Sequence, residues 1–209
     1  MACRRGRRRL FEQLDISLPP GSLTWLRGTN GSGKTSLLRI LAGLSAPSDG
    51  AVLWNSRPVA EAGCVAREGI VYISHGNALK DDLSLHEALS FLAHLAGHAD
   101  AEAKAMHALQ RLDLASRARA AVRTLSQGQR RRGALARLAL DDTPRTWILD
   151  EPYDALDSAS TQLLSDLISQ HAARGGAVLL TSHQDVNLPG LRQQLIPAPP
   201  TTPTGSLPR

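Results

Sequence analysis

The chain has 209 residues, of which 42% are hydrophobic and only 3% are aromatic. This length suits one domain, or one domain with a smaller lobe, and it can bury an aliphatic core without disulfides or metals. A cluster of arginines near the start accounts for the whole net charge of +5, and its members are Arg4, Arg5, Arg7, Arg8 and Arg9. The rest of the chain is neutral, which argues against a broad nucleic-acid-binding face. We expect this basic end to be a solvated, mobile terminus, with contact to anionic lipid as the alternative.

Cysteine content and hydropathy favour a cytosolic chain. Cys3 and Cys64 are too few and too far apart to indicate a disulfide framework or a zinc site. No segment approaches the roughly 18 uninterrupted apolar residues of a membrane span. The arginine cluster leads into Leu10 and Phe11 and then into polar residues, which is not the pattern of a secretory signal. We therefore expect this chain to contribute no membrane-spanning segment of its own.

Strands and helices are predicted to alternate along the chain. Leu14, Ile16 and Leu18 alternate with polar residues, as in a half-buried strand. Further strands are predicted over residues 23–27, 51–54, 69–74, 146–149 and 177–181, and helices over residues 34–44 and 158–173. Because strands alternate with helices, we expect an α/β fold whose mostly parallel sheet is covered on both faces.

Two segments depart from this alternation. Residues 83–140 show helical spacing of their apolar side chains and no strand signal, which predicts a helical lobe inserted between strands. After Asn187, proline recurs among threonine and glycine, and we expect a disordered tail. The predicted organisation is one domain over residues 1–186, with its core at about 10–75 and 143–186, a helical subdomain at about 76–142, and a tail over 187–209.

A glycine-rich segment between a predicted strand and a predicted helix matches the phosphate-loop pattern G-x-x-x-x-G-K-[ST]. With the residue that follows, it consists of Gly28, Thr29, Asn30, Gly31, Ser32, Gly33, Lys34, Thr35 and Ser36. The glycines allow backbone N–H groups to point at phosphates, and the helix presents its positive end to the same anion. We expect Lys34 to reach the β- and γ-phosphates and Thr35 to bind Mg²⁺.

A second candidate site lies where the apolar strand at 146–149 ends in two carboxylates. Asp150 suits Mg²⁺ bound through water, as in Walker B sites. Glu151 is one residue further along, so its side chain points elsewhere and can polarise an attacking water. The phosphate loop upstream favours this interpretation over a solvated pair of acidic residues.

These motifs, together with the sequence LSQGQ at residues 125–129, resemble the ATP-binding subunits of ABC transporters over residues 10 to about 186. The resemblance implies a P-loop (RecA-like) core with an inserted helical subdomain, and an enzyme that hydrolyses ATP with Mg²⁺. It also implies a head-to-tail homodimer. In that dimer Ser126 and Gly128, with Gln129, cap the ATP that the partner's phosphate loop holds.

Two further motifs carry the resemblance. Ala155, Leu156 and Asp157 resemble the D-loop, which lies along the dimer seam. Thr181, Ser182 and His183 resemble the switch-histidine motif, in which the histidine contacts the γ-phosphate. The implied catalytic residues are Glu151, His183 and Lys34.

The sequence also departs from the family pattern at three places. Gln127 replaces a usual glycine, which costs about 1–2 kcal/mol if the backbone there needs a positive φ. His75, or less favourably Ser74, occupies the place of a usual glutamine, where His75 can still bridge Mg²⁺, water and a membrane partner. The aromatic residue that stacks on adenine is missing, and an arginine can take its place; the candidates are Arg5, Arg7 and Arg8.

Among ABC subunits, the chain is most similar to the ATP-binding subunits of cytochrome c maturation systems (haem exporter, CcmA-type). The strings that carry this similarity include WILDEP at residues 147–152 and TSHQ at 181–184. The similarity implies integral membrane permease subunits as partners and a peripheral position at the cytoplasmic face of the bacterial inner membrane. The alternatives are a subunit of another exporter, for lipid, drug or peptide, or a soluble ABC ATPase that acts on nucleic acid or ribosomes.

One pair of histidines invites a metal or haem interpretation. His94 and His98 are four residues apart, which places both on one face of a helix. No carboxylate or cysteine accompanies them in the sequence, and Gly97 weakens the helix there. We therefore interpret them as a solvated helix end.

Overall fold

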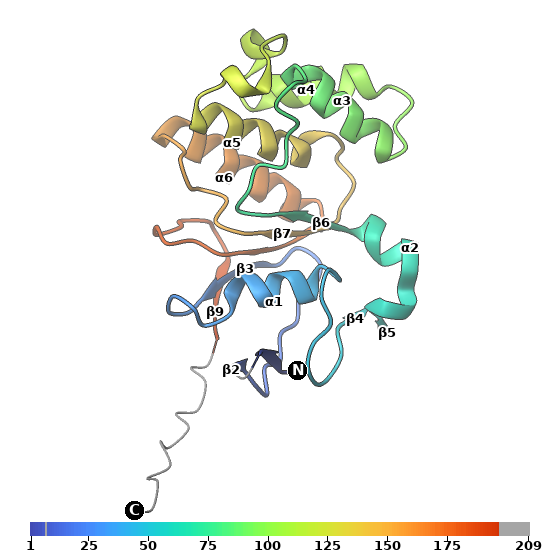
Figure 1. The fold of residues 1–209 in the computed structure, drawn as a ribbon, viewed down its shortest axis with the longest axis vertical. Coiled ribbons are helices and arrows are strands. Elements are labelled where there is room, and N and C mark those ends of the chain that lie inside the picture. The colour runs from blue at the N-terminus through green and yellow to red at the C-terminus, as the bar shows by residue number, and fades with distance from the viewer. Residues whose placement is uncertain (7, 197–209) are drawn as a thin grey trace, which may run out of the picture.

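The computed structural model describes residues 1–6 and 8–196 (Figure 1). Its centre is a five-stranded sheet with the strand order β6-β7-β8-β3-β9, and every neighbouring pair is parallel. The strands are β3 (Leu23–Arg27), β6 (Ile70–Ile73), β7 (Thr146–Leu149), β8 (Ala177–Leu180) and β9 (Leu191–Leu195). The predicted α/β fold with a mostly parallel sheet is confirmed.

Alternating side chains divide the sheet core between two faces, as the pleat of a strand requires. Ile148 and Leu179 belong to the apolar cluster around α1 (Lys34–Leu41). Their sequence neighbours Trp147 and Leu180 belong to the other cluster, with α6 (Ser158–Ala173) and the helical subdomain. Helices therefore cover both faces of the sheet, as the pattern of elements predicts (Figure 1).

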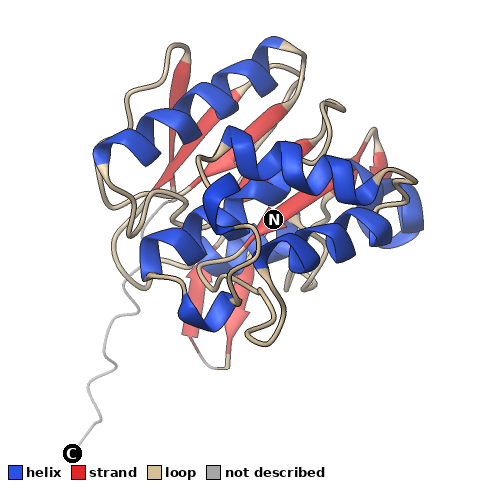
Figure 2. Cartoon of the chain, turned by 90° about the horizontal axis from the view of Figure 1, so that it is seen from above, coloured by secondary structure: helices blue, strands red, loops and turns tan. Residues whose placement is uncertain are grey.

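The helical subdomain contains α3 (Leu85–Leu95), α4 (Ala101–Arg111) and α5 (Gln127–Leu135), with short 3₁₀ turns at η1 (Ala115–Arg117), η2 (Val122–Thr124) and η3 (Ala136–Ala139). The first of these helices begins with a capping box, in which Ser84 and Glu87 satisfy each other's backbone N–H groups. Seen from above, this helical layer and α6 overlie the strands (Figure 2). Since the apolar residues of the layer share one cluster with α6, the subdomain is packed onto the core.

The basic N-terminus is a hairpin, so the prediction of a mobile terminus is wrong for the described part. Antiparallel strands β1 (Cys3–Arg5) and β2 (Arg8–Phe11) pair with each other, and Phe11 is fully buried against the α1 cluster. The apolar side chains at the end of β2 supply the burial that offsets the ordering of the arginines. Arg7 lies outside the described residues.

Three other predictions need correction, and one helix was not predicted. Residues 14–18 form no strand, although Leu14 is buried. The first helix ends at Leu41, because Gly43 takes a positive φ of 70°. The strand expected over residues 51–54 is only β4 (Leu53–Trp54), paired with β5 (Arg57–Pro58). A helix not foreseen in the sequence, α2 (Val59–Gly69), leads into β6.

The predicted disordered tail contains the edge strand β9. It pairs with β3 from Leu23 opposite Leu191 to Arg27 opposite Leu195. The domain therefore extends past the predicted boundary at residue 186, because β3 needs a backbone partner on this side. The remainder of the predicted tail, residues 197–209, lies outside the described residues. Within the described part of the chain, none of the helices combines the length and apolar composition of a membrane span.

Candidate nucleotide-binding site

A cleft of about 650 Å³ opens where strands β3, β6, β7 and β8 end. Its lining consists of Arg5, Arg8, Leu10, Asn30, Gly31, Gly33, Lys34, Thr35, Ser36, His75, Asp150, Glu151, Asp154 and His183. Ligands of open α/β sheets bind at the carboxyl ends of the strands, and this volume suits a nucleotide. The fold thus brings the phosphate loop, both acidic residues and two histidines to one place.

The phosphate loop leaves the start of α1 available to an anion. Gly33 is the N-cap of this helix at a φ of 100°, with no side-chain cap and no acidic residue in the first turn. The N-terminal N–H groups of a helix bind anions in this situation. A Cβ on Gly33 would lie 3.0 Å from Cβ of Leu10, so the residue must be glycine for the hairpin to pack here.

The loop residues fit a triphosphate. The hydroxyl of Ser32 lies 2.6 Å from where a Cβ on Gly28 would be, so any larger residue at Gly28 would fill the underside of the cradle. Nζ of Lys34 donates to the carbonyl oxygens of Gly28 at 2.8 Å and Thr29 at 3.4 Å. The ammonium group is thereby held over the loop, where phosphate oxygens are stronger acceptors than carbonyls.

Asp150 and Glu151 are linked by a threonine at the end of the neighbouring strand. The hydroxyl of Thr181 donates to Oδ1 of Asp150 at 3.0 Å and accepts from the backbone N–H of Glu151 at 2.8 Å. Thr181 is fully buried, and Asp150 and Glu151 are nearly so. One hydroxyl thus orients both acidic residues. In the sequence, Thr181 has no visible role beyond its place in the TSH string.

Glu151 and His183 are in contact. The backbone N–H of His183 donates to Oε2 of Glu151 at 2.8 Å, and Nε2 of the imidazole lies 3.5 Å from Oε1. The carboxylate is 10% exposed and the histidine 57% exposed, so the pair spans from the protein interior to the cleft. Glu151 has a positive φ of 49°, a conformation that a non-glycine residue adopts only where its surroundings hold it.

Three residues proposed for Mg²⁺, Thr35, Asp150 and His75, line the same cleft. Hydroxyl and carboxylate oxygens suit this ion, whereas an imidazole is a poorer ligand for it. His75 instead pairs with Asp154, whose Oδ2 lies 3.6 Å from Nδ1. Among the described residues no three His, Cys, Asp or Glu side chains form a metal cluster, so an ion here would take most ligands from phosphates and water.

The LSQGQ sequence at residues 125–129, called the signature segment below, lies outside this cleft. The helix α5, called the signature helix, begins within it. Ser126 is the N-cap of α5, where its Oγ accepts from the backbone N–H of Gln129 at 3.2 Å. The Gln129 side chain accepts from the Ser126 N–H in return, at 3.0 Å. Among residues 1–6 and 8–196 the hydroxyl of Ser126 donates to no acceptor, so its proton is available to a ligand. Gln127 is the first helical residue and has no positive φ, so the backbone strain considered for a non-glycine residue at this position is absent.

The segment with the D-loop sequence lies directly against the signature helix. A Cβ on Gly128 would lie 2.9 Å from the carbonyl oxygen of Ala155, so a glycine is required. Asp157 caps α6 by accepting from the N–H of Ser160 at 2.8 Å. Hydrogen bonding from Ser160 lowers the pKa of Asp157. One carboxylate oxygen of Asp157 therefore has a structural task.

The arginine hairpin lines the mouth of the cleft with Arg5 and Arg8. The guanidinium of Arg8 lies 3.7 Å from where a Cβ on Gly31 would be, which places it beside the phosphate loop. Of the three arginines considered as substitutes for the missing aromatic, these two are therefore at the nucleotide cleft.

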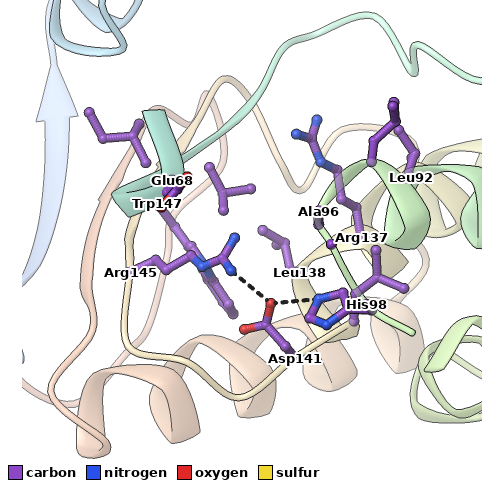
Figure 3. Close-up of a pocket in the computed structure, with 14 residues that line it drawn as sticks. Glu68, Leu92, Ala96, His98, Arg137, Leu138, Asp141, Arg145 and Trp147 are labelled. Atoms are coloured by element: carbon purple, nitrogen blue, oxygen red, sulfur yellow. Dashed lines mark hydrogen bonds and ion pairs between the residues drawn. The ribbon is translucent and has the colours of Figure 1, made fainter. Parts of the chain in front are cut away.

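A second cavity, of about 580 Å³, lies between the helical subdomain and the start of β6 and β7 (Figure 3). In it His98 and Arg145 contact the same oxygen of Asp141, at 3.2 and 3.0 Å (Figure 3). The shared helix face predicted for His94 and His98 is wrong, because α3 ends at Leu95. His98 is only 17% exposed and is hydrogen-bonded to Asp141, so its interpretation as a solvated helix end is also wrong.

A parallel sheet whose strand β3 leads through a glycine loop into a helix, with an acidic residue at the end of β7, defines a P-loop nucleotide-binding protein. A family model described as ABC transporter matches residues 11–154. This chain belongs to the ABC transporter family.

Several curated relatives of this chain are named for one process. The cytochrome c biogenesis ATP-binding export protein CcmA of Albidiferax ferrireducens is 42% identical over 196 residues, which cover 94% of this chain and 93% of that protein. The protein of the same name in Dechloromonas aromatica is 46% identical, over 90% of this chain and 92% of that protein. These are close relatives over nearly their whole length.

Solved structures give the same fold. An ATP-binding subunit of an ABC transporter superposes with a TM-score of 0.78 at 25% identity, over 87% of this chain and 76% of that one. A dimeric, post-hydrolysis ATP-binding cassette bound to ADP and Pi superposes with a TM-score of 0.77 at 21% identity, over 88% of this chain and 84% of that one. The second likeness is one of fold alone.

Proposed function

We propose that this chain is the ATP-hydrolysing subunit of a membrane ABC complex that serves cytochrome c biogenesis, by haem export or by release of a haem-loaded carrier. The observation that carries the ATPase assignment is the contact between Glu151 and His183 in the cleft of the phosphate loop. The names of the relatives support the biological process. Other exporters, for lipid, drug or peptide, are the alternative, and a soluble ATPase acting on nucleic acid or ribosomes is less favoured because the chain outside the arginine cluster is neutral.

The working form is a head-to-tail homodimer. Ser126 and Gly128 do not line their own chain's cleft, so they are available to a nucleotide on a second copy. There the free hydroxyl proton of Ser126 and the N–H groups at the start of α5 donate to the γ-phosphate, with Gln129 fixing the cap and Asp157 at the seam. The dimeric fold neighbour is consistent with this arrangement.

Hydrolysis then uses the residues of one cleft. Glu151 orients water and takes its proton while the water oxygen attacks the γ-phosphorus and the bond to ADP breaks. Lys34 and His183 donate to the γ-phosphoryl oxygens, where negative charge develops. Thr35 and Asp150 would hold Mg²⁺, with His75 beside them, and the ion would neutralise phosphate charge. The loop glycines and Asn30 would shape the cradle.

The dimer can move a partner protein because its open and closed forms differ in their affinity for the nucleotide. The partners are integral membrane permease subunits, and the chain is a peripheral subunit at the cytoplasmic face of the inner membrane. Phe91 and Leu95 on α3 are 54% and 70% exposed, which is unusual for large apolar side chains and suits a protein partner. Purification from membranes, with haem absorbance measured on the complex, tests the partner and the cargo.

The substitution Glu151→Gln tests the ATPase itself. ATP should still bind and a stable dimer should accumulate, while turnover falls by about 10²-fold or more, because the carboxylate that accepts the proton is gone. The matched control is Glu102→Gln, an exposed position on α4, which should leave turnover unchanged. Unchanged turnover in Glu151→Gln would overturn the assignment.

A further inference from the structure

Arg131, on the signature helix α5, lies in the protein interior at 3% exposure. Its guanidinium donates to four backbone carbonyls that follow two strands. The acceptors are Ser74 at 3.0 Å, His75 at 3.3 Å, Asp150 at 3.0 Å and Glu151 at 2.7 Å. One side chain thus joins the signature helix to the loops after β6 and β7, both of which line the nucleotide cleft.

Its neighbours on the helix point elsewhere. Arg130 donates to the carbonyl of Leu125, within the signature segment. Arg132 donates to the carbonyls of Leu112 and Asp113, at 3.3 Å each, within the helical subdomain. Of the three consecutive arginines, Arg131 is the one that reaches the sheet.

The burial of this cation is expensive if its only task is to fill space. Desolvation lowers the pKa of Arg131, while the charges of Asp154, Asp150 and Glu151 oppose that shift. Apolar side chains of similar volume fill an interior at least as favourably as a buried ion. What an apolar side chain does not supply is a planar fork of donors that fixes several carbonyls at once.

Three of the carbonyls that Arg131 fixes belong to residues that line the nucleotide cleft, namely His75, Asp150 and Glu151. Glu151 has a φ of 49°, which its surroundings must maintain, and Arg131 holds its carbonyl while Thr181 holds its N–H. The carbonyl of His75, which lines the same cleft, accepts from Arg131 as well. A small displacement of Glu151 would misplace the attacking water.

We propose that Arg131 is a positioning residue that makes the signature helix and the carbonyl ends of β6 and β7 one rigid unit. The inference rests on the proposed dimeric ATPase. In that dimer, Ser126 at the start of α5 caps the partner's nucleotide, while Arg131 on the same helix sets Glu151 against the chain's own nucleotide. The two ATP sites are thereby coupled, and hydrolysis becomes cooperative in ATP.

The experiment compares Arg131→Met, Arg131→Lys and the control Arg132→Met, measuring kcat, KM, the Hill coefficient of ATP hydrolysis and the melting temperature. In Arg131→Met we expect kcat to fall by about ten- to a hundredfold, the Hill coefficient to fall to about 1, and the affinity for ATP to change by less than about threefold. Arg131→Lys keeps the charge but has fewer donors, so it should recover part of kcat. Arg132→Met should keep kcat and cooperativity.

Loss of folding would not produce that pattern. An unfolded variant would not bind ATP with nearly unchanged affinity, and Arg131→Lys would not recover kcat if the site simply failed to fold. Wild-type kcat and cooperativity in Arg131→Lys and Arg131→Met, measured below their melting temperatures, would overturn the role of Arg131. An equal loss in Arg132→Met would also overturn it. A wild-type protein without ATPase activity would overturn the proposed function itself, which separates the two failures.

Discussion

The backbone N–H of His183 donates to Oε2 of Glu151 at 2.8 Å, and the imidazole of the same histidine lies 3.5 Å from Oε1. This contact joins the loops after β7 and β8, which are far apart in the sequence. The carboxylate proposed to activate water and the histidine proposed to bind the γ-phosphate therefore keep a fixed position relative to each other. A movement of either loop changes both.

The buried hydroxyl of Thr181 should contribute to turnover through the two acidic residues that it orients. Thr181→Val keeps the shape of the side chain but removes the hydrogen bonds to Asp150 and to the N–H of Glu151. We expect kcat to fall by about tenfold or more, because both acidic residues lose their fixed position. The unfolding free energy should fall by about 1–3 kcal/mol, since a buried N–H is left without an acceptor.

Thr24→Val, the same change at a buried position on β3, is the control for Thr181→Val. Steady-state ATPase assays and urea denaturation of both variants provide the comparison. Equal kcat in the two variants would show that the hydroxyl of Thr181 does not position the acidic residues.

Arg8 should contribute to nucleotide affinity. It lies at the mouth of the cleft beside Gly31, where its charge faces the phosphates or its guanidinium plane faces the base. Arg8→Ala should weaken ATP binding by about five- to tenfold, an effect that shrinks as salt is added. If the guanidinium stacks on the base, preference for ATP over GTP should change as well.

Arg4→Ala is the matched control for Arg8→Ala, because Arg4 is exposed on the neighbouring strand and does not line the cleft. Titration with a fluorescent ATP analogue at low and high salt measures both variants. If Arg4→Ala and Arg8→Ala weaken binding equally, only the general charge of the hairpin matters.

Stability should fall in mild acid because of His171. The ring is fully buried and stacks on Trp147 with centroids 3.6 Å apart, and its Nε2 donates to the carbonyl of Arg145 at 2.8 Å. Burial lowers the pKa of His171, and its Nδ1 has no partner within the described residues. The folded protein therefore keeps this ring neutral, while the unfolded chain takes up a proton below about pH 6.5.

Since the unfolded state binds the extra proton, the unfolding free energy decreases as the pH falls through that value. For a ring that stays neutral in the folded protein, the contribution between pH 7.5 and 5.5 is at most about 1.4 kcal/mol. His171→Gln should remove this part of the pH dependence, whereas His107→Gln, at an exposed position, should retain it. Urea denaturation at the two pH values measures the difference, and an equal pH dependence in all three proteins would contradict the assignment.

Local motifs were predictable because their physics is local. The phosphate loop needs glycines, a lysine and a following helix within a few residues, and the sequence shows all of them between Gly28 and Leu41. The two acidic residues after β7 and the helix at Ser158–Ala173 follow in the same way from a strand end and from apolar spacing. Each of these patterns is complete within one short stretch of chain.

Contacts between distant segments were not predictable from the sequence. Strand β9 has a polar sequence, and it is a strand because β3 offers an unpaired edge. The arginine hairpin is ordered because Leu10 and Phe11 pack onto α1. Thr181 and Arg131 carried no spacing signal, because their partners lie 19 to 57 residues away.

The amino-acid sequence by itself determined the phosphate loop, the acidic pair and the signature segment, because each depends on residue types at fixed short spacing. Only the tertiary structure decided that Glu151 rests against His183, that Thr181 orients both acidic residues, and that Arg131 joins the signature helix to the cleft. The physical reason is that a buried hydrogen bond is specified by two chain segments together, and neither segment alone contains its partner.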